Sequence, residues 1–155
     1  MDQAKATHNY WMKRALELAR ATGRLGNVPV GALVVKNGEL IAEAANLRHT
    51  TQDPTAHAEC LALRKAAQKL STWRLEDTTI YVTLEPCSMC VGAIEQARVG
   101  SLVFGAEDPQ GGAFSRTSVL EPPKGLEVLK GVLQDECQDV LSTFFSKLRS
   151  KTSGT

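Results

Sequence analysis

Two short segments of this chain hold four side chains that could do chemistry together: His57 and Glu59 in the first, Cys87 and Cys90 in the second. Imidazole and thiolate groups are ligands that zinc prefers, and three protein ligands leave the fourth tetrahedral position to a water molecule. We therefore predict that His57, Cys87 and Cys90 bind one Zn2+ ion. Glu59 stands beside this site and is expected to carry protons during a reaction of that water.

Two other interpretations of the same cysteines stay open. Cys60 follows His57 by three residues on the same helical face, so it could complete a closed, four-ligand structural zinc site. Such a site would leave Glu59 without a role, and a buried carboxylate without a partner is costly. A redox Cys-x-x-Cys motif is the second alternative, but it does not account for the histidine and the glutamate. Outside these alternatives, Cys60 and Cys137 are expected to be free thiols in the core.

The composition sets limits on size, compartment and partners. A chain of 155 residues is expected to form one domain, over residues 1–155. Its 18 Lys and Arg residues against 17 Asp and Glu give a net charge of +1, so any contact with nucleic acid must be local. The first seven residues contain no apolar run typical of a signal peptide, and no apolar stretch is long enough to span a bilayer. We therefore expect a cytoplasmic protein with no membrane contact, in which thiols stay reduced.

The elements that position the four residues alternate between helices and strands. Thr7 is expected to cap a helix over residues 8–22, in which apolar residues recur at helical spacing. The valine-rich run 30–36 predicts a strand buried on both faces. Asn37-Gly38 is the strongest short hairpin signal, because a type I′ turn needs positive φ at both central residues. Residues 40–46 are therefore expected to return as an antiparallel strand.

The first site segment follows this hairpin. Residues 47–55 are polar and are expected to be irregular, ending in a helix-start signature at residues 53–55. A helix is then predicted to run to about Leu70. His57 and Glu59 would lie in its first turn, where both can reach one metal ion placed off the helix end.

The second site segment follows the next strand. Residues 78–84 are rich in β-branched and aromatic side chains and predict a strand, followed by a helix over residues 87–97 that carries Cys87 and Cys90 on one face. Residues 101–106 predict another strand, and a strand-helix-strand unit of this length implies parallel pairing. Both metal-bearing helices would then begin at the carboxyl end of the sheet, where open α/β sheets place their sites.

The remaining chain completes the predicted fold. Residues 108–123 contain glycines, prolines and small polar residues and indicate a long functional loop. Residues 126–132 predict a fifth strand, and residues 134–149 an amphipathic helix. The predicted fold class is a three-layer α/β/α sandwich with a central mixed five-stranded sheet.

The combined motif resembles a known family. His57-Ala58-Glu59 followed by Pro86-Cys87-x-x-Cys90 matches the signature of zinc-dependent nucleobase deaminases, in which the glutamate is a proton shuttle and not a ligand. Five further segments are similar to the bacterial tRNA-specific adenosine deaminases, and the likeness covers residues 8–149. These segments are residues 9–12, 28–32, 53–59, 83–87 and 103–106.

This resemblance implies a cytidine-deaminase-like fold, one zinc ion per subunit, a homodimer, and the anticodon stem-loop of a tRNA as partner. The implied reaction is hydrolytic conversion of adenosine to inosine at the wobble position, in bacteria mainly of arginine tRNA. Zinc would activate a water molecule that attacks C6 of adenine. Glu59 would take the proton of this water, protonate N1, and later protonate the departing amine.

The resemblance also implies a set of substrate contacts. Asn46 would hydrogen-bond the base, Val28 and Leu84 would form walls of the pocket, and the backbone N–H of Ala58 would face the ring. An asparagine at a strand end is also a frequent turn former, so a purely structural role stays open for Asn46.

Three residues are implied to contact the RNA around the target base. Asp108 stands in the loop that contacts neighbouring nucleotides in the family, and Phe145 and Arg149 stand in the C-terminal helix that meets the stem-loop. The resemblance implies RNA contacts for Lys147 and Lys151 as well, but from the sequence alone the three cations Lys147, Arg149 and Lys151 are equally consistent with a solvated helix end. Met89, Val91 and Ile94 of the helix over residues 87–97 could serve the dimer interface that the resemblance implies, or simply the core.

Two functional alternatives remain from the sequence. The first is a deaminase of a free base or nucleotide, of the guanine or cytosine type, because these enzymes share the metal signature. The second is a zinc-stabilised RNA-binding module without catalysis, which should be insensitive to Glu59. The chain also departs from many family members at residues 122–125, where they carry an Asn-His-Arg turn, and at Cys60, where an aliphatic residue is usual.

Overall fold

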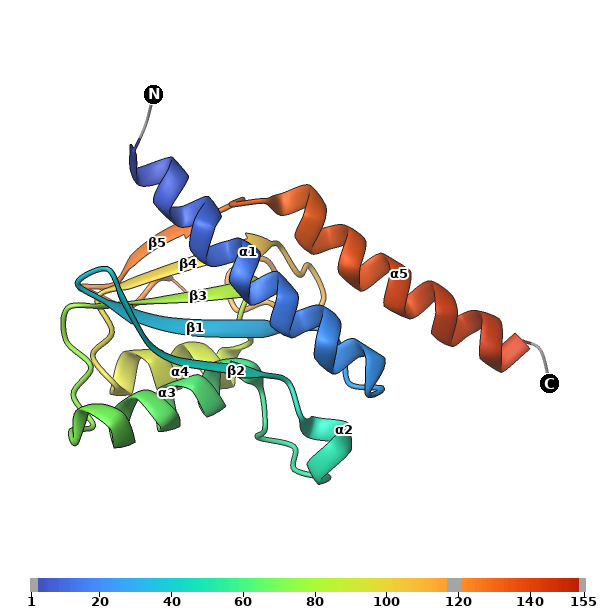
Figure 1. Ribbon diagram of the computed structural model, residues 1–155, viewed down its shortest axis with the longest axis horizontal. Coiled ribbons are helices and arrows are strands. Elements are labelled where there is room, and N and C mark those ends of the chain that lie inside the picture. Colours follow the sequence, from blue (N-terminus) through green and yellow to red (C-terminus); the bar gives the residue numbers. More distant parts are fainter. Residues whose placement is uncertain (1–2, 117–120, 154–155) are drawn as a thin grey trace.

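A mixed five-stranded sheet forms the middle layer of the protein, with helices on both faces (Figure 1). The computed structural model describes residues 3–116 and 121–153. Strand β1 pairs antiparallel with β2 and β3, whereas β3, β4 and β5 are parallel. The predicted three-layer α/β/α sandwich is thus confirmed. In spatial order the strands are β2 (Glu39–Ala45), β1 (Gly31–Lys36), β3 (Thr78–Leu84), β4 (Ser101–Ala106) and β5 (Glu127–Lys130).

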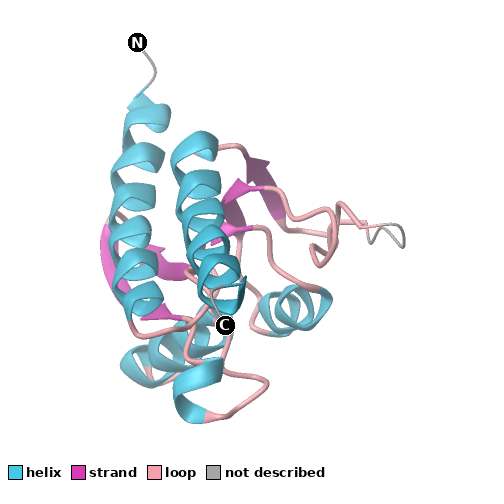
Figure 2. Ribbon diagram, turned by 90° about the vertical axis from the view of Figure 1, so that its right-hand side faces the viewer, coloured by secondary structure: helices cyan, strands magenta, loops and turns pink. Residues whose placement is uncertain are grey.

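Two pairs of helices cover the two faces of the sheet. Helices α1 (Gln3–Arg24) and α5 (Gln134–Ser153) lie side by side on one face (Figure 2). Helices α3 (Ala58–Leu70) and α4 (Ser88–Gln96) pack together on the other face (Figure 1). The described helices include none with the length and apolar content of a membrane span.

Alternation along the strands builds the two halves of the core. Val34 and Ile80 belong to the cluster beneath α3 and α4, whereas their neighbours Leu33 and Tyr81 belong to the cluster beneath α1 and α5. Because successive side chains of a strand point to opposite faces, a strand covered on both faces must be apolar throughout. This is why the continuous run 30–36 correctly predicted a buried strand.

The hairpin between β1 and β2 has the predicted turn. Asn37 and Gly38 have φ angles of 51° and 74°, as a type I′ turn requires. The register then sets the position of the site: Gly31 pairs with Ala45, and Ala32 pairs with Val82. The carboxyl ends of β2 and β3 therefore lie at the same end of the sheet, which we call the site edge. The segments that lead to α3 and α4 both start there.

Several predicted boundaries were wrong. Helix α1 begins at Gln3, and the Thr7 hydroxyl donates to the Gln3 carbonyl inside the helix instead of capping its start. The C-terminal helix continues beyond residue 149, to Ser153. Strand β5 is shorter than the predicted 126–132, and residues 117–120 of the predicted loop lie outside the described part.

The polar segment 47–55 also contains an unpredicted helix. Residues Arg48–Thr51 form the single turn α2, which has no side-chain cap of its own. The buried Asn27 Oδ1 instead accepts the backbone N–H groups of His49 and Thr50, each at 3.0 Å. Asn27, which is distant in sequence, thus takes the place of a side-chain cap at the start of α2.

Candidate metal centre and active site

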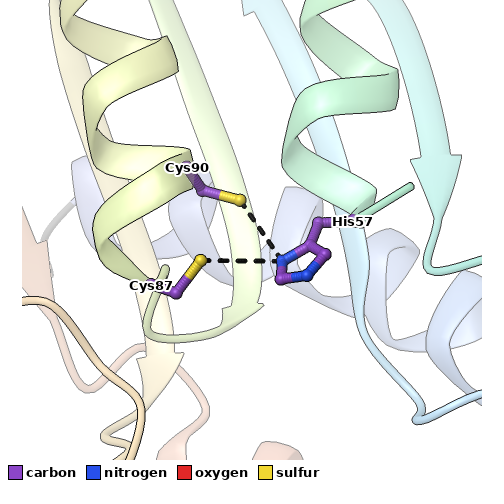
Figure 3. Close-up of side chains that lie close together, drawn as sticks. All are labelled: His57, Cys87 and Cys90. Atoms are coloured by element: carbon purple, nitrogen blue, oxygen red, sulfur yellow. Dashed lines mark hydrogen bonds between the residues drawn. The ribbon is translucent and has the colours of Figure 1, made fainter. Parts of the chain in front are cut away.

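Three predicted ligands converge at the edge of the sheet. The Nδ1 atom of His57 lies 3.6 Å from the Cys87 sulfur and 3.5 Å from the Cys90 sulfur (Figure 3). One ligand atom from each residue lies within 4.8 Å of the other two. One imidazole and two thiols on a common centre form a donor set that suits zinc and leaves a coordination position open.

The starts of two helices position these side chains. His57 is the N-cap of α3 and Cys87 is the N-cap of α4, and both have extended backbones without a side-chain capping bond. We predicted that His57 lies in the first turn of α3, but it precedes that turn. The placement keeps both side chains off the helix ends, where the free N–H groups and the helix dipoles stabilise negative charge.

The thiols differ strongly in acidity. Hydrogen bonding from Cys90, and then from His57, lowers the pKa of Cys87 to about 3, although burial opposes this. The same contact with Cys87 raises the pKa of His57. Hydrogen bonds to Cys60 and Cys87, together with burial, raise the pKa of Cys90. One thiolate thus forms readily, and both thiols must lose their protons to bind a metal.

Glu59 has the properties of a proton carrier. Its side chain is only 4% exposed, and burial raises its pKa to about 7, with the charge of Cys87 acting in the same direction. Its own backbone N–H and the nearby His57 act in the opposite direction. A carboxyl group that titrates near neutral pH can both accept and donate a proton there.

Cys60 lies beside this group without belonging to it. Its sulfur is 3.9 Å from the sulfur of Cys90, and this contact lowers the pKa of Cys60. Among the described residues, however, the cluster of converging ligand atoms consists of His57, Cys87 and Cys90. The prediction of a core thiol was wrong for Cys60, which is partly exposed, and is confirmed for Cys137, which is buried.

The predicted base-contacting residues lie along the same edge. Asn46 follows β2 and is buried; its Nδ2 donates to the Val28 carbonyl at 3.0 Å, and its Oδ1 accepts from the Arg48 N–H at 3.1 Å. Leu84 ends β3 and is partly buried, and Ala58 is buried as the first residue of α3. The structure therefore links Asn46 directly to Val28, and it shows a structural role for this asparagine.

The predicted RNA-contacting residues lie outside the metal cluster. The Asp108 carboxylate accepts the N–H groups of Gln110 and Gly111 and thereby folds a tight turn. Phe145 is 38% exposed on α5 and packs edge-on against Phe144. Arg149 is an exposed residue of α5, which covers the face of the sheet opposite α3 and α4.

One residue with a central place near the site was not predicted. Glu85 is 2% exposed and accepts hydrogen bonds from Asp108, Phe114 and Ser115. The available signal was an acidic residue placed directly between an apolar strand and Pro86-Cys87, where a side chain has little access to solvent.

This chain is similar in sequence and fold to deaminases. Residues 6–149 match the profile of the MafB19-like deaminase family. The tRNA-specific adenosine deaminase of Bacillus subtilis is 48% identical over 145 residues, covering 91% of this chain and 90% of that protein. A solved structure from a study of A-to-I editing by tRNA:A34 deaminases superimposes with a TM-score of 0.76, at 39% identity over 85% of this chain and 99% of the other.

A deaminase that acts on a different base has a similar fold at lower sequence identity. Guanine deaminase from Nitrosomonas europaea has a TM-score of 0.75 at 30% identity, over 86% of this chain and 81% of the other. The fold is thus common to enzymes that act on different bases, and of these three proteins the two tRNA enzymes are the more similar to this chain in sequence. The chain belongs to the MafB19-like deaminase family and, within it, to the tRNA-specific adenosine deaminases.

Proposed function

We propose that this protein is a zinc-dependent hydrolase that converts adenosine to inosine at the wobble position of a tRNA anticodon, with arginine tRNA as substrate. The observation that carries the proposal is the convergence of His57, Cys87 and Cys90 beside the buried Glu59. The chain around this site is 48% identical to a tRNA-specific adenosine deaminase.

In this reaction the three ligands hold the zinc ion and Glu59 transfers the protons. Zinc held by the three ligands would supply an activated water as nucleophile. The Glu59 carboxylate accepts the first proton of this water and delivers it to N1 of adenine, and it then accepts the second proton and delivers it to the departing amine. Water is consumed, the C6–N bond breaks, and ammonia and inosine are the products. One carboxyl group can serve each transfer because its pKa lies near 7.

The base is held by residues at the same edge of the sheet. Asn46 uses one donor and one lone pair on Val28 and Arg48, and an amide has two of each, so capacity remains for hydrogen bonds to the base. Leu84 and Val28 supply apolar walls, and the N–H of Ala58 faces the ring. The target nucleotide must leave its stack to enter, which is inexpensive in an anticodon loop.

Contacts to the rest of the anticodon stem-loop come from two other places. The turn at Asp108 meets the nucleotides beside the target, and Phe145 and Arg149 of α5 meet the stem-loop through stacking and charge. We further propose a cytoplasmic homodimer with one zinc ion per subunit. Met89 is 40% exposed near the start of α4 and is available to that interface, whereas Val91 and Ile94 are buried in the core.

The direct test is to incubate the zinc-loaded protein with an arginine-tRNA anticodon stem-loop and to detect inosine by sequencing. The matched control is the same stem-loop with guanosine in place of the wobble adenosine. Conversion confined to the wobble adenosine supports the proposal. Fully zinc-loaded protein that leaves this adenosine unchanged contradicts it.

Deamination of a free base is the second candidate, because the guanine deaminase of Nitrosomonas europaea shares the fold. Release of ammonia from guanine or cytosine, with no change in the stem-loop, would select this alternative. Tight RNA binding without ammonia release from any of these substrates would instead indicate a zinc-stabilised RNA-binding module.

A further inference from the structure

The carboxylate of Glu85 lies buried between the metal-binding segment and the loop that follows β4. Glu85 comes directly after β3 and two residues before Cys87, and its backbone N–H donates to the Ala106 carbonyl at the end of β4. Its side chain is 2% exposed. A carboxylate in such a place requires hydrogen-bond donors, because burying it without partners is costly.

The donors all come from one loop. The Asp108 N–H donates to Oε1 at 3.0 Å, and the Ser115 hydroxyl donates to the same oxygen. The N–H groups of Phe114 and Ser115 donate to Oε2 at 2.8 and 2.9 Å. One side chain therefore binds both the start and the end of the loop 108–115.

The packing around this carboxylate leaves it little freedom. A Cβ atom added at Gly112 would lie 2.3 Å from the Glu85 carboxyl carbon, so this close approach requires glycine. The Ala113 N–H donates to the Pro86 carbonyl at 2.9 Å. Phe114 stacks on Phe104 of β4 with ring centroids 6.4 Å apart. The loop is thus tied directly to the segment 84–87, which carries a proposed pocket wall and a metal ligand.

We propose that Glu85 is a positioning residue for the RNA substrate. It holds the Asp108 turn at a fixed place relative to Cys87, so that the nucleotides beside the target base meet a preformed surface. Ordering a mobile loop on binding costs free energy, and fixing the loop in advance removes that cost from the binding step. This inference rests on the proposed function and adds a residue to it.

The closest replacement is Glu85→Gln, which keeps the shape but turns one acceptor oxygen into a donor. The amide NH2 fits best at the Oε1 position, where the Ser115 hydroxyl can turn round and accept. The Asp108 N–H then faces a donor and loses its partner. We expect KM for the anticodon stem-loop to rise about tenfold with kcat within about threefold, since the change affects binding of the flanking nucleotides.

The matched control is Glu107→Gln, the same chemical change one residue before Asp108. Glu107 accepts from Lys130 at an exposed position, whereas the hydrogen bonds to the Glu85 carboxylate come from Asp108, Phe114 and Ser115. Its kinetics should equal those of the wild type. Gly112→Ala provides a second route, because the added methyl displaces the Glu85 carboxylate without removing it, and it should reproduce the rise in KM.

Amide hydrogen exchange tests the positioning without any RNA. In Glu85→Gln, the amide of Asp108 should exchange faster than in the wild type because it loses its acceptor, and those of Phe114 and Ser115 should also exchange faster because their acceptor loses its charge, whereas zinc content should stay at one per chain. If Glu85→Gln does not fold, Ser115→Ala, which removes only the hydroxyl donor, takes its place in both measurements.

Two results would overturn the inference: unchanged exchange at these amides, or loss of kcat and zinc with an unchanged KM. The second would show that Glu85 only supports the metal segment. If the wild type deaminates no RNA, the proposed function fails, and the exchange rates still decide whether Glu85 holds the loop.

Discussion

The sulfur atoms of Cys60 and Cys90 lie 3.9 Å apart, and of the two Cys90 alone belongs to the converging ligand group of the described residues. A free thiol therefore packs against a proposed metal ligand without sharing its geometry. The geometry therefore favours an open, catalytic site with three protein ligands over a closed, structural site with four.

Replacing Cys60 tests which kind of site is present. We expect Cys60→Ala to keep one zinc per chain and activity within about threefold of the wild type. Cys90→Ala removes a ligand and should lower activity by more than about a hundredfold, because changes to outer-shell partners alone cost 10–100-fold. Metal analysis of both purified variants gives the comparison. Equal loss of zinc in the two variants would point to the four-ligand site.

Removal of zinc should destabilise the fold, because the ligands join the starts of α3 and α4. A metal that binds only the folded chain adds about 2.7 kcal/mol at a free concentration one hundred times its Kd. Thermal unfolding with a chelator, and again after zinc is returned, measures this contribution. Cys90→Ala should melt at the same temperature in both conditions. A wild type whose melting ignores zinc would argue against a resident metal.

Asn46 is expected to serve both stability and binding. Asn46→Ala leaves the Val28 carbonyl and the Arg48 N–H without this partner, which costs about 1–3 kcal/mol of unfolding free energy. Asn27→Ala is the matched control, because Asn27 is also a buried amide that holds the backbone of His49 and Thr50. Both variants should unfold at lower denaturant concentration. Only Asn46→Ala should also raise KM, and a KM equal to that of the control would leave Asn46 a purely structural role.

The strands and the grouping of His57, Cys87 and Cys90 could be predicted from the sequence, because the strand signals are local and the order of the strands follows from them. The bounds 78–84 and 101–106 match β3 and β4, since apolar, β-branched runs bounded by turn residues leave little choice. The positive φ at Asn37 and Gly38 was predictable for the same reason. His57 and Cys87 were correctly brought together because strand pairing places the ends of β2 and β3 at one edge.

The missed features depend on contacts between distant residues. The turn α2 is held by Asn27, which is more than twenty residues earlier, so no pattern within 47–55 announces it. Glu85 acquires its role from donors at Asp108 and Ser115, which the sequence does not place beside it. Cys60 contacts Cys90 because α3 and α4 pack together, and helix packing is not visible in either helix alone. Organisation as one domain over 1–155 stays a prediction.

Alkaline pH should weaken the contact between α1 and the sheet. The Tyr81 hydroxyl lies 2.7 Å from Nδ1 of His8, and burial raises the pKa of Tyr81 to about 12. The folded chain thus binds this proton more tightly than the unfolded chain, in which the pKa is about 10. The stabilisation is full below about pH 10 and is lost as pH rises towards 12. Burial also raises the pKa of Cys137 from about 9 to about 12, so its contribution is lost from about pH 9 upwards and adds to that of Tyr81 above pH 10.

The titration of Tyr81 can be followed separately. The chain has two tyrosines, so in a Tyr10→Phe background the phenolate absorbance reports Tyr81 alone. We expect this absorbance to rise well above pH 10, together with loss of structure in circular dichroism. Titration at about pH 10 in a chain that is still folded would contradict the effect of burial.

The most direct test of the account is deamination by Glu59→Gln and Glu59→Ala. The glutamine side chain keeps the volume of Glu59 but cannot carry the proton, so both variants should lose about 10²- to 10⁴-fold in kcat, the usual contribution of a general acid-base group. Inosine formed in the anticodon stem-loop is measured beside zinc content and thermal stability. We expect loss of inosine with one zinc per chain and an intact fold. Turnover retained by both variants would contradict it.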